Sequence, residues 1–241
     1  DWHFMDSLRQ TETANSAALL ESAVRTINAE AEGVAALASA LDAELGVAFI
    51  EAVATISRAT SDGASGAASG AAMGRVIVTG LGKSGHIAGK IAATLASTGT
   101  PAFFVHAGEA RHGDLGMITG DDVVLAISNS GEAPELANLI AYSRRFSIPL
   151  IGITSRESSS LGAQCDVVLL LPQLAEACGT GVVPSTSTTM TLAMGDAVAI
   201  ALMENRSFTA EHFREFHPGG KLGARLSRVA DLMHSGDALP M

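Results

Sequence analysis

The residues most suited to chemistry begin with a glycine-rich turn, Gly80-Leu81-Gly82-Lys83-Ser84-Gly85-His86. Its spacing, G-x-G-x-x-G after a strand pattern, brings backbone amides close to a phosphate. A dinucleotide site also needs an acidic side chain at the end of the next strand, which here ends in Val105-His106. A Walker A loop fails because Ile77 stands where its first glycine belongs. The turn therefore offers Gly82 amides, Lys83 and Ser84 to an anion, and a nucleotide-dependent oxidoreductase remains an alternative.

Two clusters of short polar residues follow. Ser128-Asn129-Ser130-Gly131 precedes a helical pattern, where free amides and the positive end of the helix dipole suit a phosphate. An ordinary N-cap needs only one such residue, so three favour phosphate binding by Ser128, Asn129 and Ser130. The second cluster, residues 185–189, opens the last long helix and offers Ser187 and Thr188 to the same phosphate, although helix capping explains it equally well.

Three carboxylates lie near these clusters. Glu176 follows the last strand pattern in a loop away from any helix start, so we expect burial to raise its pKa toward the working pH. A carboxylate of that kind can move a proton beside a carbonyl, and an ordinary surface carboxylate is the alternative. Glu132 and Glu135 are three residues apart on one predicted helical face. Glu135 is a candidate second base, and Glu132 is either a substrate contact or a residue that satisfies the helix dipole.

The basic side chains complete the set. Lys83 can neutralise a phosphate or a developing enediolate, and His217, in a Pro-Gly-Gly turn, can relay a proton or open a sugar ring. We expect His86 and His112 either to contact the substrate or to support the residues that contact it. Together with His106 and Asp114 they could form a metal cluster, but packing roles are favoured over ligation, and we expect no metal and no cofactor.

The elements that must position these residues change character along the chain. Residues 11–60 carry apolar side chains at helical spacing, which predicts two amphipathic helices, and residues 61–74 read as a Gly/Ala/Ser linker. Continuous apolar runs then alternate with helix-sized segments, which predicts an α/β fold with a doubly wound parallel sheet of about five strands. The predicted strands are 75–79, 102–106, 122–127, 149–154 and 166–170, and the predicted helices are 84–97, 133–146, 158–163 and 188–204.

Composition excludes several classes of protein. Among 241 residues, 15 basic and 25 acidic side chains give a net charge of −10 without any basic run, which argues against nucleic-acid binding. Only 17% of residues are charged and 47% are apolar, so we expect an oligomer. Two cysteines without C-x-x-C spacing fit the cytoplasm, and we find no stretch near 18 apolar residues and no signal peptide. Residues 1–10 are expected to be a tag or a disordered start.

Read together, the motifs resemble one known family. The glycine turn, residues 99–106, His112-Gly113-Asp114, the serine cluster, Glu176-Ala177-Cys178 and the segment 217–223 occur in the order seen in the sugar isomerase (SIS) domain of D-arabinose 5-phosphate isomerases. The likeness runs from about residue 35 to the end. It implies residues 75–230 as the SIS domain, with a flavodoxin-like strand order, and residues 231–241 as the start of a truncated CBS region.

This resemblance implies an aldose-ketose isomerase that interconverts D-ribulose 5-phosphate and D-arabinose 5-phosphate in the lipopolysaccharide octulosonate (KDO) pathway. It places the catalytic roles on Lys83, Glu135, Glu176 and His217, without a metal. It also implies a homotetramer in which His217 comes from a neighbouring subunit. Ala133 departs from the hydroxyl that many relatives carry there, which removes one phosphate contact. A non-catalytic sugar-phosphate sensor and the oxidoreductase stay open as alternatives.

Overall fold

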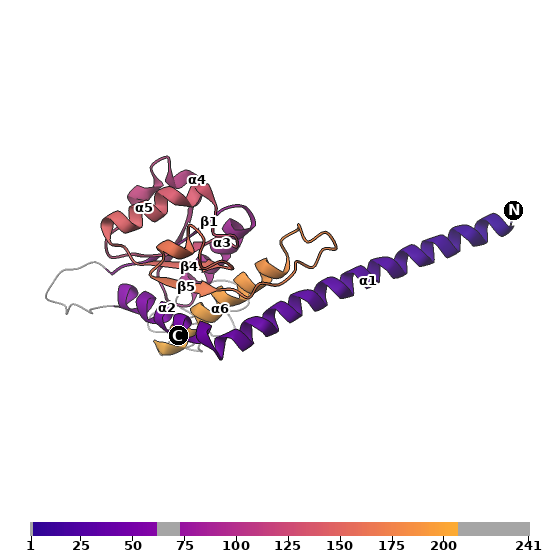
Figure 1. The fold of residues 1–241 in the computed structure, drawn as a ribbon, viewed down its shortest axis with the longest axis horizontal. Coiled ribbons are helices and arrows are strands. Elements are labelled where there is room, and N and C mark those ends of the chain that lie inside the picture. The colour runs from indigo at the N-terminus through magenta and orange to yellow at the C-terminus, as the bar shows by residue number, and fades with distance from the viewer. Residues whose placement is uncertain (1, 62–72, 207–241) are drawn as a thin grey trace, which may run out of the picture.

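A five-stranded parallel sheet lies at the centre of the computed structural model, which describes residues 2–61 and 73–206, with side chains from residue 15 (Figure 1). The strand order is β2-β1-β3-β4-β5, which confirms the predicted doubly wound sheet with flavodoxin-like order. The strands are β1 (Val76–Gly80), β2 (Ala102–His106), β3 (Val123–Ile127), β4 (Leu150–Thr154) and β5 (Val167–Leu170). Each lies within about one residue of its predicted range at both ends.

The strands form because their apolar runs are buried on both faces. Every residue of β1, β3 and β4 is buried, the pattern that parallel strands covered by helices require. Register keeps the carboxyl ends level: Gly80 at the end of β1 pairs with His106 of β2 and Ile127 of β3. The loops that follow these strands therefore start side by side at one edge of the sheet.

Helices cover both faces and make a three-layer structure. One core joins α1, α2, α3 and α6 to the face that carries Val76, Val78 and Leu125. A second core joins α4, η2 and α5 to the face that carries Ile77 and Val124. The helices are α1 (Trp2–Leu41), α2 (Glu44–Thr60), α3 (Gly82–Ser97), α4 (Ala107–Ala110), α5 (Ala137–Phe146) and α6 (Thr186–Asn205), with 3₁₀ turns η1 (Asp114–Met117), η2 (Pro134–Leu136) and η3 (Gly162–Gln164).

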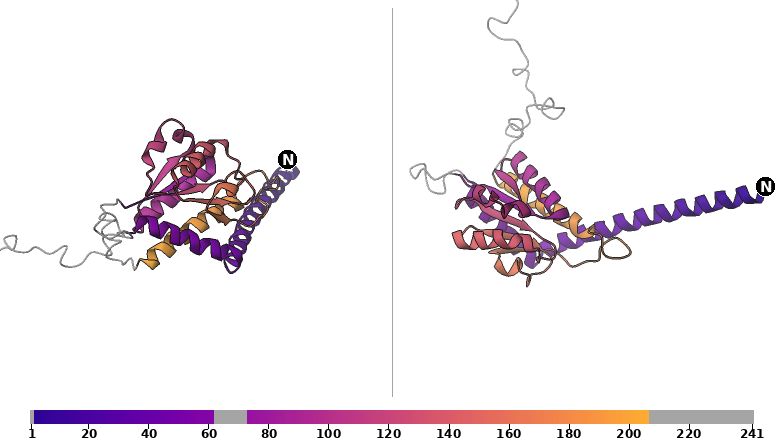
Figure 2. Two further views of the ribbon diagram at one scale, coloured as in Figure 1. Left: turned by 60° about the vertical axis from the view of Figure 1, so that its left-hand side comes forward. Right: turned by 90° about the horizontal axis from the view of Figure 1, so that it is seen from above.

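The two predicted N-terminal helices are present, and the first is longer than expected. It begins at Trp2, so residues 2–10 extend the helix that was predicted to start near residue 11. Helix α1 packs against α6 only near its C-terminal end, where Gly33 lies against Thr186 and Met190. The rest projects from the body, as Figures 1 and 2 show. A bend of 80° separates it from α2.

Two predicted helices differ from the structure. The predicted helix 158–163 is wrong: the segment is a turn ending in η3, because the Ser160 amide donates to Glu132 Oε1 and the Leu161 amide to the Gly131 carbonyl. These contacts with the loop after β3 replace the bonds a helix needs. The predicted helix 133–146 begins with the 3₁₀ turn η2, and α5 starts only at Ala137.

Helix α6 corrects the expectation that no segment is long and apolar enough to cross a membrane. It has 20 residues and a mean hydropathy of 1.2 over an 18-residue window, long and apolar enough to cross a membrane. Half of that window is buried inside the fold, where Met190, Met194, Val198 and Leu202 belong to the core. The bent pair of α1 from Asn15 and α2 meets the same criterion jointly. The apolarity of α6 thus reflects its place between α1, α2 and α3.

One ion pair fixes the start of the sheet. The Arg75 guanidinium donates to both oxygens of Asp122, at 3.0 Å from Nε to Oδ1 and 2.8 Å from Nη2 to Oδ2. The Arg75 and Thr119 amides also donate to this carboxylate, which is 1% exposed. Burial raises the pKa of Asp122, but the Arg75 and amide hydrogen bonds outweigh it and hold the pKa below its ordinary value.

Asp122→Asn should lower the free energy of unfolding by about 2 kcal/mol at pH 7, because it removes a buried charged acceptor from Arg75. Since the folded-state pKa is depressed, this stabilisation is complete above the unfolded pKa of about 3.9 and is lost as pH falls through the lower folded value. Urea titrations at pH 7 and at about pH 3 measure both effects. Asp121→Asn, at the exposed neighbouring carboxylate, is the control; equal losses in the two variants would contradict the assignment.

Candidate active site

Three turns meet at the carboxyl edge of the sheet and enclose a pocket of about 350 Å³. They are the turn after β1, the loop after β3, and the first turns of α6 together with Pro184, which lies two residues before that helix. Seven residues proposed from the sequence line the pocket together: Lys83, Ser84, Ser128, Asn129, Ser130, Ser187 and Thr188. The structure thus brings the three polar clusters to one place, where ligands bind in doubly wound sheets. Sequence reasoning missed three further lining residues, Leu81, Pro184 and Thr191.

The turn after β1 presents a cation to this pocket. Gly82 has a φ of +56°, a conformation that glycine adopts without strain, and it opens α3. The turn leaves Lys83 exposed at the pocket wall, beside Ser84. Among the residues that the structure describes, Lys83 forms no ion pair. Its ammonium group is therefore available to an anionic ligand.

The loop after β3 is held rigidly from within. Ser128 Oγ accepts the Gly131 amide at 3.1 Å, and Ser130 Oγ accepts the Glu132 amide at 3.3 Å. Gly131 has a φ of +69°, and a Cβ there would lie 1.9 Å from Ser159 Oγ, so only glycine fits. In both bonds the serine oxygen accepts, which leaves the hydroxyl hydrogens of Ser128 and Ser130 to donate to a ligand.

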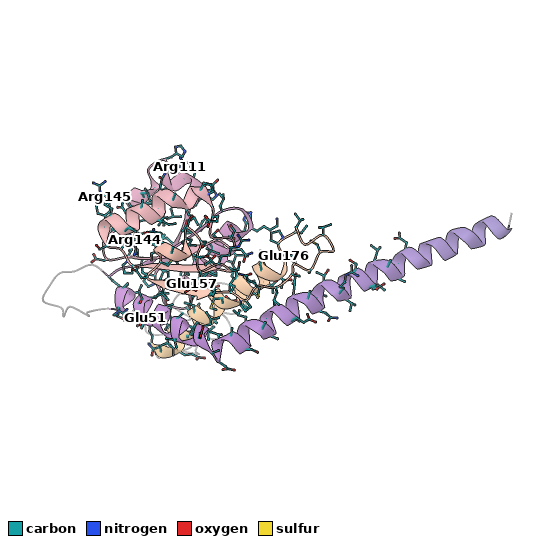
Figure 3. All side chains as sticks on the ribbon, in the orientation of Figure 1. Glu51, Arg111, Arg144, Arg145, Glu157 and Glu176 are labelled. Atoms are coloured by element: carbon teal, nitrogen blue, oxygen red, sulfur yellow. The ribbon has the colours of Figure 1, made fainter. Side chains whose placement is uncertain are left out.

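Glu176 lies at the N-terminus of α6, where Figure 3 labels it. Its Oε2 accepts the amides of Ser185 at 2.7 Å and Ser187 at 3.3 Å, and its Oε1 accepts the Ser187 hydroxyl. Ser185, the N-cap residue, makes no side-chain cap bond of its own. The Glu176 carboxylate therefore caps α6, and Ser187 connects it to the pocket.

This position corrects the expectation for the pKa of Glu176. Burial raises that pKa, as predicted, but the hydrogen bonds from Ser187 and Ser185 outweigh burial and lower the pKa below its usual value. From the sequence we expected Glu176 in a loop away from any helix start, whereas this loop folds back onto the start of α6. In the structure described here Glu176 is ionised at neutral pH.

Other candidate residues lie apart from the pocket lining. Glu132 turns to Ser160, whose hydroxyl donates to Oε2 and whose amide donates to Oε1 at 3.0 Å, and these two bonds lower the pKa of the exposed carboxyl group. Glu135 is half-buried in η2. His86 and His112 are exposed. His217 lies outside the described residues.

A metal cluster among the histidines does not form in the described part of the chain. No three His, Cys, Asp or Glu side chains within residues 15–61 and 73–206 are grouped so as to hold a metal ion. His106 instead uses Nδ1 to accept the Gly108 amide at 3.2 Å, which caps the short helix α4. His106 therefore has a structural role at the end of β2.

Two larger hollows lie elsewhere. One of about 650 Å³ runs between the corner of α1 and α2 and strand β5, with Leu45 and Leu170 among its residues. The other, of about 680 Å³, lies beside α5, where Arg144 is already paired with Asp166. Neither combines a free cation with the hydroxyl clusters, so the smaller pocket is the candidate site.

The sheet order and the position of this pocket define a doubly wound α/β domain with its polar site at the carboxyl edge. Residues 71–201 match the SIS domain family, and the chain belongs to this family.

Curated relatives and solved structures agree with that membership. Arabinose 5-phosphate isomerase KdsD of Escherichia coli K12 is 58% identical over 167 residues, and that of Pseudomonas aeruginosa is 56% identical over the same length. Each match covers 69% of this chain and 51% of the relative, so the chain spans about half the length of these relatives.

Among solved structures, a protein of Escherichia coli CFT073 in complex with arabinose 5-phosphate is 38% identical with a TM-score of 0.73, covering 84% of this chain and 98% of its own. The sugar isomerase domain of the RpiR transcription factor from Sphaerobacter thermophilus has a TM-score of 0.61 at 18% identity, covering 80% and 94% respectively. At that identity the likeness shows the fold alone.

Glu176→Ala should lower the free energy of unfolding by about 1 kcal/mol at pH 7, because the α6 amides lose their acceptor. Since the folded-state pKa of Glu176 is depressed, the stabilisation is present above the unfolded pKa and is lost as pH falls through the folded one. Urea titrations of both proteins at neutral and acidic pH test this. A variant as stable as the parent at pH 7 would show that the carboxylate does not cap α6.

Proposed function

We propose that this chain is an aldose-ketose isomerase that interconverts D-ribulose 5-phosphate and D-arabinose 5-phosphate, as the names of its relatives suggest. The observation that carries the proposal is the convergence of Lys83, Ser128 and Ser187 on one pocket, with the Glu176 carboxylate held beside it by Ser187. The pocket supplies donors for a phosphate, and Glu176 supplies an acceptor for a proton. Both are needed by a reaction that shifts a carbonyl along a sugar phosphate.

Phosphate binding follows from the donors in the pocket. The ammonium group of Lys83 supplies positive charge, and the hydroxyls of Ser84, Ser128 and Ser130 supply hydrogen-bond donors. The Thr188 hydroxyl can join them once it turns from the Ser185 carbonyl, to which it donates at 2.8 Å. We assign these hydroxyl-bearing residues, together with Asn129 and Ser187, to the phosphate, and Lys83 to catalysis. The terminal phosphate then fixes the sugar so that its carbonyl end reaches toward the carboxylates.

Proton transfer follows from the ionised carboxylate. Glu176 removes the proton beside the carbonyl and returns it to the neighbouring carbon, through an enediolate whose charge Lys83 stabilises. Glu135 is the second carboxylate, and His217 opens the sugar ring or relays a proton from a neighbouring subunit. The electrons stay within the sugar, so this reaction needs no redox cofactor. The KDO pathway and the cytoplasm are the setting we propose for it.

The enzyme is further proposed to be a homotetramer, held in part by α1. Leu20, Val24 and Ile27 are 69%, 57% and 66% exposed on the projecting part of α1. Their spacing of four and three residues continues through Ala31 and Val34, which is the seam of a helix that packs on another helix. A second copy of α1 supplies such a partner.

Incubation with D-ribulose 5-phosphate and EDTA in heavy water should give D-arabinose 5-phosphate that carries deuterium at carbon 2, because an enediolate takes its proton from a base in exchange with solvent. NMR of the products follows both the sugar and the isotope. No turnover would contradict the isomerase and leave the sugar-phosphate sensor. A melting temperature that rises with NAD(P) but not with the sugar phosphate would indicate the oxidoreductase.

Variants assign the roles within that assay. Glu176→Gln and His217→Ala should each lower kcat by at least about 100-fold, the usual scale for acid-base groups. Glu132→Gln is the matched control, since its carboxylate contacts Ser160 outside the pocket, and it should retain most of the activity. Near-normal turnover in either of the first two variants would remove that residue from the mechanism.

Ile27→Glu should shift the protein to a smaller assembly in sedimentation velocity, because a charge in an apolar helix seam costs more than the contact contributes. Ser22→Glu adds the same charge to an exposed position on another face of α1 and should leave the assembly unchanged. Identical sedimentation of Ile27→Glu and the parent would show that the α1 seam does not hold the oligomer.

A further inference from the structure

Ser187 both lines the pocket and donates a hydrogen bond to Glu176. It is 6% exposed in the first turn of α6 and lines the pocket that we assign to phosphate. Its hydroxyl donates to Glu176 Oε1, and its amide donates to Glu176 Oε2 at 3.3 Å. Its carbonyl accepts the Thr191 hydroxyl at 2.8 Å, which fixes the turn. The side chain thus borders the phosphate site while it holds the carboxylate.

A serine hydroxyl carries one hydrogen, so it cannot donate fully to two anions at the same time. In the structure this hydrogen is directed to Glu176. We propose that Ser187 is a positioning residue whose hydroxyl turns from Glu176 to the phosphate when the ligand binds, so that phosphate binding removes one of the bonds holding the carboxylate. This inference rests on one part of the proposed function, namely that the pocket binds a phosphate group.

Ser185 prevents the carboxylate from leaving the site. Its amide donates to Glu176 Oε2 at 2.7 Å and its hydroxyl lies 3.3 Å from the same oxygen. The Ser185 hydroxyl also accepts the Ala177 amide at 3.0 Å, which ties the loop to the start of α6. Ser185 does not line the pocket, so a phosphate there leaves these bonds in place. Oε2 remains anchored, and Oε1 becomes free to face the substrate.

Freeing Oε1 strengthens Glu176 as a base. The Ser187 hydroxyl is the largest of the hydrogen-bond contributions that lower the pKa of this group, so its loss raises the pKa toward the ordinary value. The carboxylate is then a better proton acceptor when a phosphate is bound than when the pocket is empty. The enzyme would thereby favour phosphorylated over unphosphorylated sugars by base strength as well as by affinity.

Two other titratable groups, Lys83 and Cys178, lie near Glu176 or the pocket, and their titrations must be distinguished from that of Glu176. Lys83 faces the pocket from the turn after β1. Cys178 lies two residues along the Glu176 loop, where the Thr180 hydroxyl and the Val183 amide lower its pKa to about 7. No charged side chain is among the causes that shift the pKa of Glu176 in the described residues.

The test is a carbon-13 NMR titration of the full chain labelled at glutamate side-chain carboxyl groups, with and without saturating inorganic phosphate. The Glu176 signal is the one lost in Glu176→Gln, and a Cys178→Ala background removes the thiol titration. In the parent, phosphate should move the Glu176 midpoint to higher pH. In Ser187→Ala the midpoint should already be higher without phosphate, and phosphate should move it less.

Two matched variants separate this effect from simple repulsion between phosphate and carboxylate. Ser185→Ala removes a holding hydroxyl outside the pocket, so its midpoint starts higher and the phosphate-dependent movement persists. Ser84→Ala removes a pocket hydroxyl without a bond to Glu176, so phosphate binds more weakly and the movement at saturation is unchanged. An equal movement in Ser187→Ala and the parent would mean repulsion alone and would overturn the inference, while leaving the isomerase proposal intact.

Binding itself is read from the backbone amide signals of Lys83 and Ser128, with nitrogen-15 labelling added to the same samples. If inorganic phosphate perturbs neither, it does not occupy the pocket, and both this inference and the assignment of the phosphate site fail. If it perturbs them without moving the Glu176 midpoint in the parent, only the shared role of Ser187 is overturned. Isomerase activity is not needed for either reading.

Discussion

The constraint on which the structure depends is that its strands are parallel and buried on both faces. Each connection must then return the chain to the same edge, so every loop that follows a strand begins at the carboxyl edge of the sheet. The level register of Gly80 and Ile127 starts the loops after β1 and β3 side by side, and the first turns of α6 line the same pocket. Lys83 and Thr188, more than a hundred positions apart, thereby line one pocket, and the buried strands fix where the loops of that pocket begin.

This constraint also explains why much of the fold and part of the site could be predicted from the sequence. Continuous apolar runs located the strands, and the polar clusters after β1 and β3 had to converge once the sheet was parallel. The glycine turn after β1 and the serine cluster after β3 are short segments, so they could be recognised as candidate anion sites without knowledge of distant contacts. The resemblance to the SIS family added the order of the motifs, which no single cluster carries.

What could not be predicted depends on contacts between loops. The segment around Ser160 has too few residues to favour a helix against Glu132 and Gly131, which take its amides from another loop. Glu176 was placed correctly after the last strand, but nothing local shows that nine residues later the chain returns to offer it the amides of Ser185 and Ser187. Its lowered pKa follows from that return, and so the sign of the shift required the structure.

Glu176 therefore combines two demands that pull in opposite directions. As the cap of α6 it is stabilised by amides and hydroxyls, which favour its ionised form and weaken it as a base. As the proton acceptor that we propose, it needs the opposite. A group held by permanent bonds alone would satisfy only the first demand. Ser187, one of the groups that hold the carboxylate, also lines the pocket that we propose for the phosphate. In that proposal the empty protein keeps the cap of α6, and the bound ligand supplies the change in Glu176 that catalysis requires.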